Sequence, residues 1–195
     1  GLSRPPLGPV FLSAAFLRLA LAVLASIMVV SGFILHMAPA LAGKGFDMTT
    51  AAAIAGSGGL IAVPAKLFAG SLFDRFSAPV VWLGFQGLLV VACVLLALPG
   101  ASLPVNVAGS WAMFICGGGM NVAVACIAAR YFAGAVFGSV YGALMALMAL
   151  CGAGGPLFAS MVHDATGSYA AALWGATGLC VVSALALWGT KPQAA

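Results

Sequence analysis

The fold is decided by the segment Pro64-Ala65-Lys66-Leu67-Phe68-Ala69-Gly70-Ser71-Leu72-Phe73-Asp74-Arg75-Phe76. It begins inside an apolar run of membrane-spanning length and ends with an acid and a base side by side. Lys66 lies eight residues before Asp74, which at about 1.5 Å per helical residue is about 12 Å inside the apolar layer. A cation within hydrocarbon is unfavourable, and such residues are as a rule functional. We therefore predict a membrane-spanning helix here and a functional role for Lys66.

The composition predicts that most of the chain lies in a membrane. Of the 195 residues, 64% are hydrophobic and 5% are charged, and the mean hydropathy is +1.21. A soluble domain of this size could not cover its surface with so few charges. The formal net charge of +4 comes from seven scattered Lys and Arg residues and three acids, which form no basic face. Nucleic acid is therefore not expected as a partner.

Nothing in the sequence indicates an enzyme. It has no phosphate-binding loop, no paired carboxylates, no HExxH and no other metal-ligand spacing, so neither a cofactor nor a metal is expected. The cysteines lie in apolar runs without CxxC spacing, which is typical of small buried residues. There are five of them: Cys93, Cys116, Cys126, Cys151 and Cys180.

Six apolar runs reach the length of about 20 residues that a membrane-spanning helix needs. Lipid admits only helices or closed barrels, and these runs lack the alternation of barrel strands. We predict an all-α membrane protein with a cytoplasmic linker over residues 1–14, a six-helix bundle over 15–189 and a cytoplasmic tail over 190–195. The predicted helices cover about 15–41, 50–73, 79–98, 104–129, 137–162 and 169–189.

The basic residues predict the orientation of the bundle. One side of it carries Arg4, Arg18, Arg75, Arg130 and Lys191, whereas the other side has only Lys44. The positive-inside rule then places both ends of the chain in the cytoplasm. We expect an integral, multi-pass protein of a plasma membrane, first of all the bacterial inner membrane. The chain starts with Gly1 and a linker-like segment, so we expect it to be a piece of a longer polypeptide.

A weak internal repeat relates the two halves of the chain. Residues 70–74 read Gly-Ser-Leu-Phe-Asp at the end of the second helix, and residues 160–164 read Ser-Met-Val-His-Asp at the end of the fifth. Each of these helices also has an interior proline, Pro64 and Pro156. They are the middle helices of two triplets that cross the membrane in opposite directions. This arrangement predicts an inverted 3+3 repeat, as in secondary transporters.

The loop after the second helix carries a family resemblance. Gly70-Ser71-Leu72-Phe73-Asp74-Arg75 resembles the G-x-L-x-D-R signature in each half of major facilitator superfamily transporters. Other segments resemble the C-terminal six-helix half of the monocarboxylate and oxalate/formate branch, namely His36-Met37-Ala38-Pro39-Ala40-Leu41, Ala129-Arg130-Tyr131-Phe132, Phe137-Gly138-Ser139-Val140-Tyr141-Gly142, and Gly155-Pro156 followed by Asp164-Ala165-Thr166-Gly167-Ser168-Tyr169. The resemblance implies half of a twelve-helix fold, whose N-terminal six-helix half is missing. It also implies alternating-access transport of a small organic anion, with a monocarboxylate as the expected substrate.

The same resemblance implies a role for Lys66, which lies four residues before Gly70. In this branch a basic residue at that position meets the substrate carboxylate. The alternative is that the ammonium snorkels along its apolar stem to the cytoplasmic headgroups. The chain departs from the branch at Ala62, where proton-coupled carriers have an acid, and in the fifth helix, which lacks the lysine of oxalate carriers. A coupled proton or a counter-anion is left open as a further partner.

Three other polar residues lie where they could contact an anion. His36, near the outer end of the first helix, could titrate near neutral pH, or it could be structural. Asn121 follows three glycines in the fourth helix, and its amide needs a partner, either another helix or the substrate. Tyr141 in the fifth helix could donate to a carboxylate.

Charged residues at the helix ends are expected to gate or anchor the bundle. Asp74 ends its own helix, where the macrodipole is negative, so it should bind the N-terminus of a neighbouring helix, while Arg75 suits its own helix end. Such a pair would form a latch for alternating access, with an ordinary charged turn as the alternative. We group with them Gly70 of the signature, Asp164 at the matching place of the second triplet, and Arg130 at the cytoplasmic boundary.

Two other functions stay open on the sequence. One is a carrier of another substrate class in the same superfamily, although a sugar or drug carrier is expected to have more polar or acidic residues in its helices. The other is a membrane protein without transport activity, whose six helices serve assembly or regulation.

Overall fold

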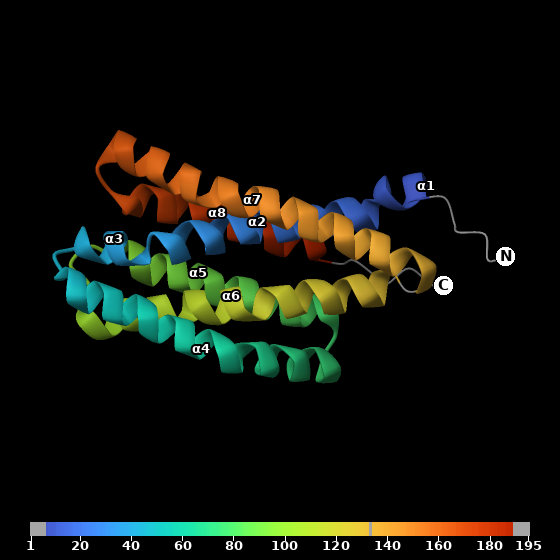
Figure 1. Cartoon of the computed structure of the whole chain (residues 1–195), viewed down its shortest axis with the longest axis horizontal. Coiled ribbons are helices and arrows are strands. Elements are labelled where there is room, and N and C mark those ends of the chain that lie inside the picture. The colour runs from blue at the N-terminus through green and yellow to red at the C-terminus, as the bar shows by residue number, and fades with distance from the viewer. Residues whose placement is uncertain (1–6, 133, 189–195) are drawn as a thin grey trace.

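Eight α-helices and one 3-10 turn make up the part of the chain that the computed structural model describes, residues 7–132 and 134–188 (Figure 1). The helices are α1 (Leu7–Phe11), α2 (Ala14–Leu35), α3 (Met37–Ala42), α4 (Met48–Arg75), α5 (Ala78–Ala97), α6 (Leu103–Tyr131), α7 (Phe137–Thr166) and α8 (Tyr169–Leu187), and the 3-10 turn η1 is Gly134–Val136. No strand occurs within these ranges.

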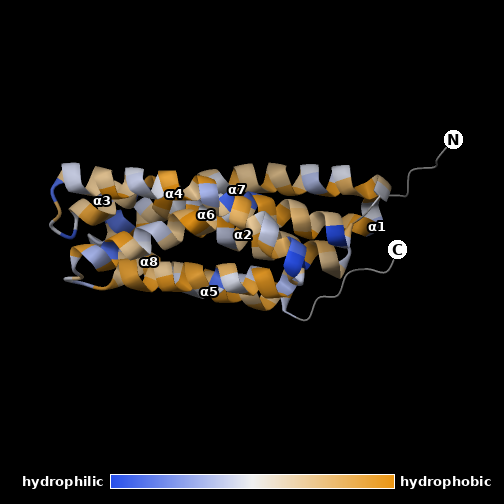
Figure 2. Cartoon of the chain, turned by 90° about the horizontal axis from the view of Figure 1, so that it is seen from below, coloured by the Kyte–Doolittle hydropathy of each residue, from blue (hydrophilic) through white to orange (hydrophobic). Residues whose placement is uncertain are grey.

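Six of the helices are long and apolar enough to cross a membrane. They are α2, α4, α5, α6, α8 and α7, the last of which continues from η1. Figure 2 shows hydrophobic residues along most of the length of the helices. The prediction of an all-α chain with six helices that could span a membrane is thus confirmed for the described residues, and it supports a multi-pass membrane protein.

The first predicted helix, about 15–41, is divided in two at His36. Helix α2 ends at Leu35 and α3 begins at Met37, and His36 between them has φ −94° and ψ 10°. Pro39 explains the break, because a proline lacks an N–H and its ring clashes with the carbonyl four residues earlier, here that of Leu35. The apolar run continues through the break, so hydropathy alone predicts a single helix.

The bounds of the other helices lie within four residues of the predicted ones. Helix α7 shows the largest difference, because it continues to Thr166 and stops at Gly167, which has a positive φ of 71°. The short helix α1 lies inside the predicted linker 1–14. The predicted tail, 190–195, lies outside the described residues, as do Arg4 and Lys191.

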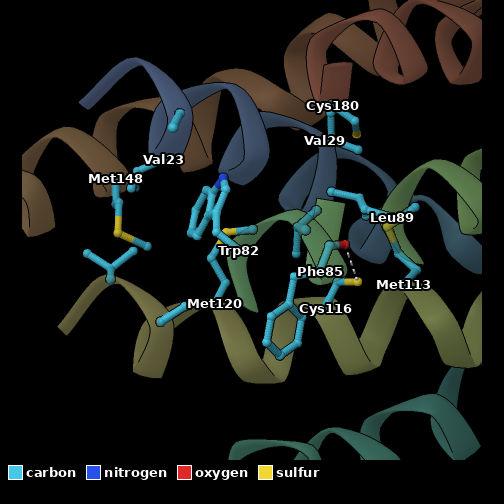
Figure 3. Close-up of a cluster of buried hydrophobic side chains, with 14 of the residues drawn as sticks. Val23, Val29, Trp82, Phe85, Leu89, Met113, Cys116, Met120, Met148 and Cys180 are labelled. Carbon is cyan, nitrogen blue, oxygen red and sulfur yellow. Dashed lines mark hydrogen bonds between the residues drawn. The ribbon is translucent and has the colours of Figure 1, made fainter. Parts of the chain in front are cut away.

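The bundle is built from helices that lie side by side in pairs. Helix α4 lies along α6 and helix α7 lies along α2, while α5 contacts both α6 and α8, and α8 contacts α2. The core lies between α2, α5, α6 and α8. Figure 3 shows their side chains meeting there, among them Trp82 and Leu89 of α5, which are 1% and 0% exposed.

A small polar network lies inside this core. The Ser183 hydroxyl donates to the carbonyl of Ala22 (2.8 Å), lies 2.8 Å from Ser26 Oγ, and accepts a hydrogen bond from Trp82 Nε1 (3.3 Å). Polar side chains need partners inside a membrane, so this network ties α2, α5 and α8 together. The cysteines are free thiols. Those that are buried are Cys93, Cys116 and Cys180, and those that are half-buried are Cys126 and Cys151.

Helices α4 and α7 are far less covered than their neighbours. Only 22% of the α4 span and 17% of the 134–166 span are buried, against 56% for α2 and for α6. Their outer faces carry large apolar side chains: Leu60, Val63 and Leu67 on α4, and Leu150 and Leu157 on α7 are 63% to 78% exposed. Each helix therefore has one face inside the bundle and one face open along its length.

Candidate functional site

Helix α4 carries Lys66 and the signature residues, and local chemistry defines where the helix begins. The Asp47 carboxylate accepts a hydrogen bond from the Thr50 N–H (2.9 Å) and so caps the helix. Hydrogen bonds from Thr50 hold the pKa of Asp47 below its usual range, because they favour the ionised carboxylate. The helix ends at Arg75, after which Phe76 is extended. Its 28 residues exceed the length that a membrane core requires.

The contact between α4 and α6 sets the depth of the candidate residues. A Cβ at Gly58 would collide with the ring of Phe114, and a Cβ at Gly118 would collide with the carbonyl oxygen of Ala62. Only glycine allows the two helices to approach so closely. Lys66 lies one turn after Ala62, and Asn121 lies three residues after Gly118, in the same direction along the paired helices. The two side chains are therefore at the same level.

Lys66 and Asn121 also lie on the same side of the helix pair. On α6, Gly117 faces Val30 and Ile34 of α2, and Asn121 follows Gly117 by one turn, so it points toward the side where α2 lies. On α4, Phe68 lines an apolar pocket shared with α5. Lys66 is two residues from Phe68, roughly 160° round the helix, and therefore points away from α5.

Lys66 is an exposed cation within the α4 span. It stands nine residues before Arg75, about 14 Å from the end of the helix. It has no hydrogen bond or ion pair with any residue that the structure describes. Asn121 is exposed as well and also has no hydrogen bond within the described ranges. Together they offer an ammonium and an amide on the open side of α4 and α6.

His36 and Tyr141 are not part of this arrangement. Tyr141 is half-buried in the second turn of α7, where its ring stacks on Phe137 (5.6 Å between centroids, 10° between planes). His36 is half-buried at the opposite end of the bundle, and its Nδ1 lies 2.9 Å from the Gly32 carbonyl oxygen. Because a carbonyl only accepts, that nitrogen carries the proton. The structure thus has Lys66 and Asn121 at the same level on the paired helices α4 and α6, and it places the other two substrate candidates elsewhere.

Arg130 links the ends of α4 and α6. Its guanidinium donates to the carbonyl of Phe76 (3.1 Å) and to the carbonyl of Phe73, and it lies 6.0 Å from the centroid of the Phe73 ring. Phe73 lies in the last turn of α4 and Phe76 is the C-cap residue after it, where the helix end has unpaired acceptors and a negative dipole. Arg130 therefore caps the C-terminal end of α4. This role is more specific than that of a residue at the cytoplasmic boundary, which the sequence indicates.

The charged residues of the signature are exposed. Asp74 and Arg75 are exposed, and neither has a hydrogen bond or ion pair with the described part of the chain. The structure therefore provides Asp74 with no partner at a neighbouring helix N-terminus among residues 7–132 and 134–188. Gly70 is half-buried, and a Cβ there would meet nothing within 4 Å. No contact among residues 7–132 and 134–188 explains the glycine.

Asp164 lies at the other end of the bundle, beside the two histidines. Its Oδ1 is 3.7 Å from Nδ1 of His163. The His163 ring stacks on Tyr169 at 4.3 Å, and the ring of His36 approaches the same tyrosine at 5.5 Å. This cluster of aromatic and charged residues is one that sequence reasoning missed. The available indication was that the only two histidines of the chain both lie at helix ends on the side of Lys44.

Comparison with protein-family models and with curated protein sequences gives no match for this chain. Within the described ranges, no group of three or more His, Cys, Asp or Glu residues could hold a metal ion. The functional interpretation therefore rests on the arrangement of the residues themselves.

Proposed function

We propose that this chain is the C-terminal half of a secondary transporter that moves a small organic anion, first of all a monocarboxylate, by alternating access. The observation that carries the proposal is Lys66, an exposed cation without a partner among the described residues, which stands level with Asn121 inside two membrane-spanning helices. The support comes from the requirement that a charge within the membrane should have a counter-charge.

A carboxylate fits what Lys66 and Asn121 offer. Its two oxygens accept hydrogen bonds, and its negative charge balances one ammonium. The amide of Asn121 would supply a neutral donor at the same depth. One cation balances one carboxylate, so the chemistry favours a monocarboxylate over a dicarboxylate. The substrate would bring its own charge to the site and remove the unfavourable isolated cation.

The exposed apolar faces of α4 and α7 support the proposal that the complete protein has an N-terminal half. An N-terminal bundle of six helices would cover the exposed apolar residues of both helices and would enclose the side on which Lys66 lies. The pairing of helices also supports the inverted 3+3 repeat. Helix α4 of the first triplet lies along α6, the first helix of the second triplet, and α7 lies along α2 in the reciprocal way. Such reciprocal pairing is expected of inverted repeats.

In this proposal the Asp74-Arg75 loop lies in the cytoplasm with both termini, in the bacterial inner membrane. Because Asp74 and Arg75 lack partners in the described chain, their latch partners would belong to the other half. A coupled proton or a counter-anion would complete the cycle.

The test is uptake of a radiolabelled monocarboxylate such as lactate or pyruvate by the full-length carrier in proteoliposomes. Lys66→Gln should abolish uptake while membrane insertion stays normal, and Lys66→Arg should retain part of it because the charge is kept. Leu67→Gln, which places the same amide on the adjacent exposed position, controls for a polar group in the span. Unchanged uptake by the Lys66→Gln carrier removes Lys66 from the substrate site.

The same open faces also suit a second candidate function, assembly with another membrane protein without transport. Exposed apolar faces along two helices are what a helical partner would cover. Flux distinguishes the two. A complete protein that binds a membrane partner but moves no carboxylate supports assembly, and flux of sugars or drugs in place of carboxylates supports a carrier of another substrate class.

A further inference from the structure

A cavity of about 250 Å³ lies at the end of the bundle where α3 is found, opposite α1 (Figure 1). Three connections line it: the one between α3 and α4, the one between α5 and α6, and the one between α7 and α8. A water molecule takes about 30 Å³ in the liquid, so the cavity could hold about eight waters. It is large enough for a small organic anion.

Lys44 lines the cavity, and two hydrogen bonds position its ammonium. Its ammonium donates to the Leu98 carbonyl (3.2 Å) and to Asn106 Oδ1 (2.8 Å). Asn106 is fully buried, and its Nδ2 donates to the carbonyls of Ala101 (2.9 Å) and Ser102 (3.1 Å). These two bonds fix the amide so that its oxygen faces Lys44. An ammonium has three donors, so one of them is left for a ligand.

The charge of Lys44 is not balanced within the described chain. Both of its acceptors are neutral, and no carboxylate of the described residues lies within ion-pair distance. Asp47, the acid next along the chain, is exposed and caps α4 through Thr50. Burial lowers the pKa of Lys44, since a partly desolvated ammonium is less stable than one in water. An anion in the cavity would reverse this effect.

The cavity lining also includes His163, Ser168 and Tyr169. The imidazole of His163 stacks on Tyr169. Its ring nitrogens can form hydrogen bonds with a ligand. Asp164, 3.7 Å from His163 Nδ1, does not line the cavity and has a side chain that is 81% exposed.

His36 is the other histidine of this cluster and provides a comparison. Its ring lies 5.5 Å from that of Tyr169, between centroids, and its Nδ1 is hydrogen-bonded to the Gly32 carbonyl. It does not line the cavity. Of the two imidazoles that flank Tyr169, only that of His163 can act on a ligand in the cavity directly.

We propose that this cavity is a second binding site for a small carboxylate, with Lys44 as its cation and His163 as a further hydrogen-bonding side chain of its lining. The substrate class and the position at the outer mouth rest on the proposed function. Lys66 lies 18 residues beyond the start of α4, about 27 Å along the helix, so the two sites are separate. The outer site would collect the anion before it enters the membrane.

Binding of trifluoroacetate, followed by fluorine NMR with the purified full-length protein in nanodiscs, tests the proposal. This probe is a small carboxylate that is an anion at neutral pH. Lys44→Gln should weaken binding by about tenfold or more, as expected for the loss of a charge-assisted hydrogen bond. Lys44→Arg should stay within about threefold of the wild type, because the charge is kept.

Two further comparisons guard against a variant that merely fails to fold. Ala40→Phe fills the cavity from α3 without removing any polar group, and it should abolish binding at this cavity. His163→Ala should weaken that binding, whereas His36→Ala, at a position that does not line the cavity, should leave it unchanged. Wild-type binding by both Lys44→Gln and Ala40→Phe overturns the proposal.

The Lys66→Gln protein separates this proposal from the proposed function. Its binding of trifluoroacetate at the outer site should be unchanged, even when its uptake is lost. If Lys66→Gln abolishes binding and Lys44→Gln does not, the outer site is disproved and the transport proposal stands. If Lys44→Gln abolishes binding and Lys66→Gln leaves uptake unchanged, the outer site stands and the role of Lys66 is disproved.

Discussion

Replacing Gly155 by alanine tests the contact that holds α7 against α2. Gly155 is buried, and a Cβ at this position would collide with the carbonyl oxygen of Met28 and with Ser31 Oγ, and would lie 3.0 Å from the Gly32 nitrogen. Two of these three atoms belong to the backbone of α2 and cannot rotate away. The variant can therefore fold only if α7 moves outward.

The size of the effect follows from two opposed terms. Overfilling a close contact destabilises by about 1–3 kcal/mol, whereas alanine is a better helix former than glycine by up to about 1 kcal/mol. We expect a net loss of about 1–2 kcal/mol, which lowers the melting temperature of a chain of this size by roughly 2–8 °C.

Gly154→Ala is the matched control, because a Cβ at this adjacent position would meet nothing within 4 Å. It keeps only the favourable propensity term, so its melting temperature should rise by up to about 4 °C. Unfolding can be followed with a thiol-reactive fluorogenic dye, which reports the exposure of the buried Cys93, Cys116 and Cys180. A Gly155→Ala protein that melts at or above the wild type, or together with Gly154→Ala, refutes this account of the contact.

Two other outcomes are expected. Arg130→Gln loses its hydrogen bonds to the carbonyls at the C-terminal end of α4 and should lower the melting temperature by roughly 2–4 °C, for a loss of about 1 kcal/mol. The control Arg75→Gln removes an arginine from the same region that has no hydrogen bond to the described residues, so it should leave the melting temperature unchanged. Equal changes in the two variants would contradict the role of Arg130. Burial lowers the pKa of Lys44, so the rate at which an acylating reagent modifies Lys44 should reach half its maximum at a pH below the ordinary 10.5. Asn106→Leu should lower this midpoint pH further, because the hydrogen-bond acceptor that favours the ammonium is lost. Because the folded state releases the Lys44 proton at a lower pH than the unfolded state, the free energy of unfolding should rise as the pH approaches 10.5. Mass spectrometry of the labelled peptide gives the midpoint pH of the reaction. A midpoint at or above 10.5 contradicts the effect of burial.

The helical spans could be predicted because few alternatives exist in lipid. An apolar run of about 20 residues must form a helix or a barrel strand, and no strand pattern is present in this chain. The break at His36 was not predicted, although Pro39 was visible, because hydropathy is continuous across it. A proline alone does not predict such a break, because Pro64 and Pro156 lie inside the continuous helices α4 and α7.

The sequence predicted how deep Lys66 lies in its helix, but not toward which side of the bundle its side chain points. The distance of Lys66 from the helix end follows from counting residues, whereas the side to which it points depends on how α4 is rotated against α6, which Gly58 and Gly118 set. Contacts such as that of Lys44 with Asn106, 62 residues apart, depend on how three loops meet. No local pattern encodes them. The inverted repeat and the family resemblance stay predictions.

The bridge from Arg130 to the final carbonyls of α4 restricts how the protein can move. Sliding α4 along α6 by a single helical step, about 1.5 Å, would strain both hydrogen bonds of Arg130 and the contact where the Phe114 ring fills the space of a Cβ at Gly58. These contacts oppose shear within the pair at two heights. In a large rearrangement we therefore expect α4 and α6 to move together against the helices beside them.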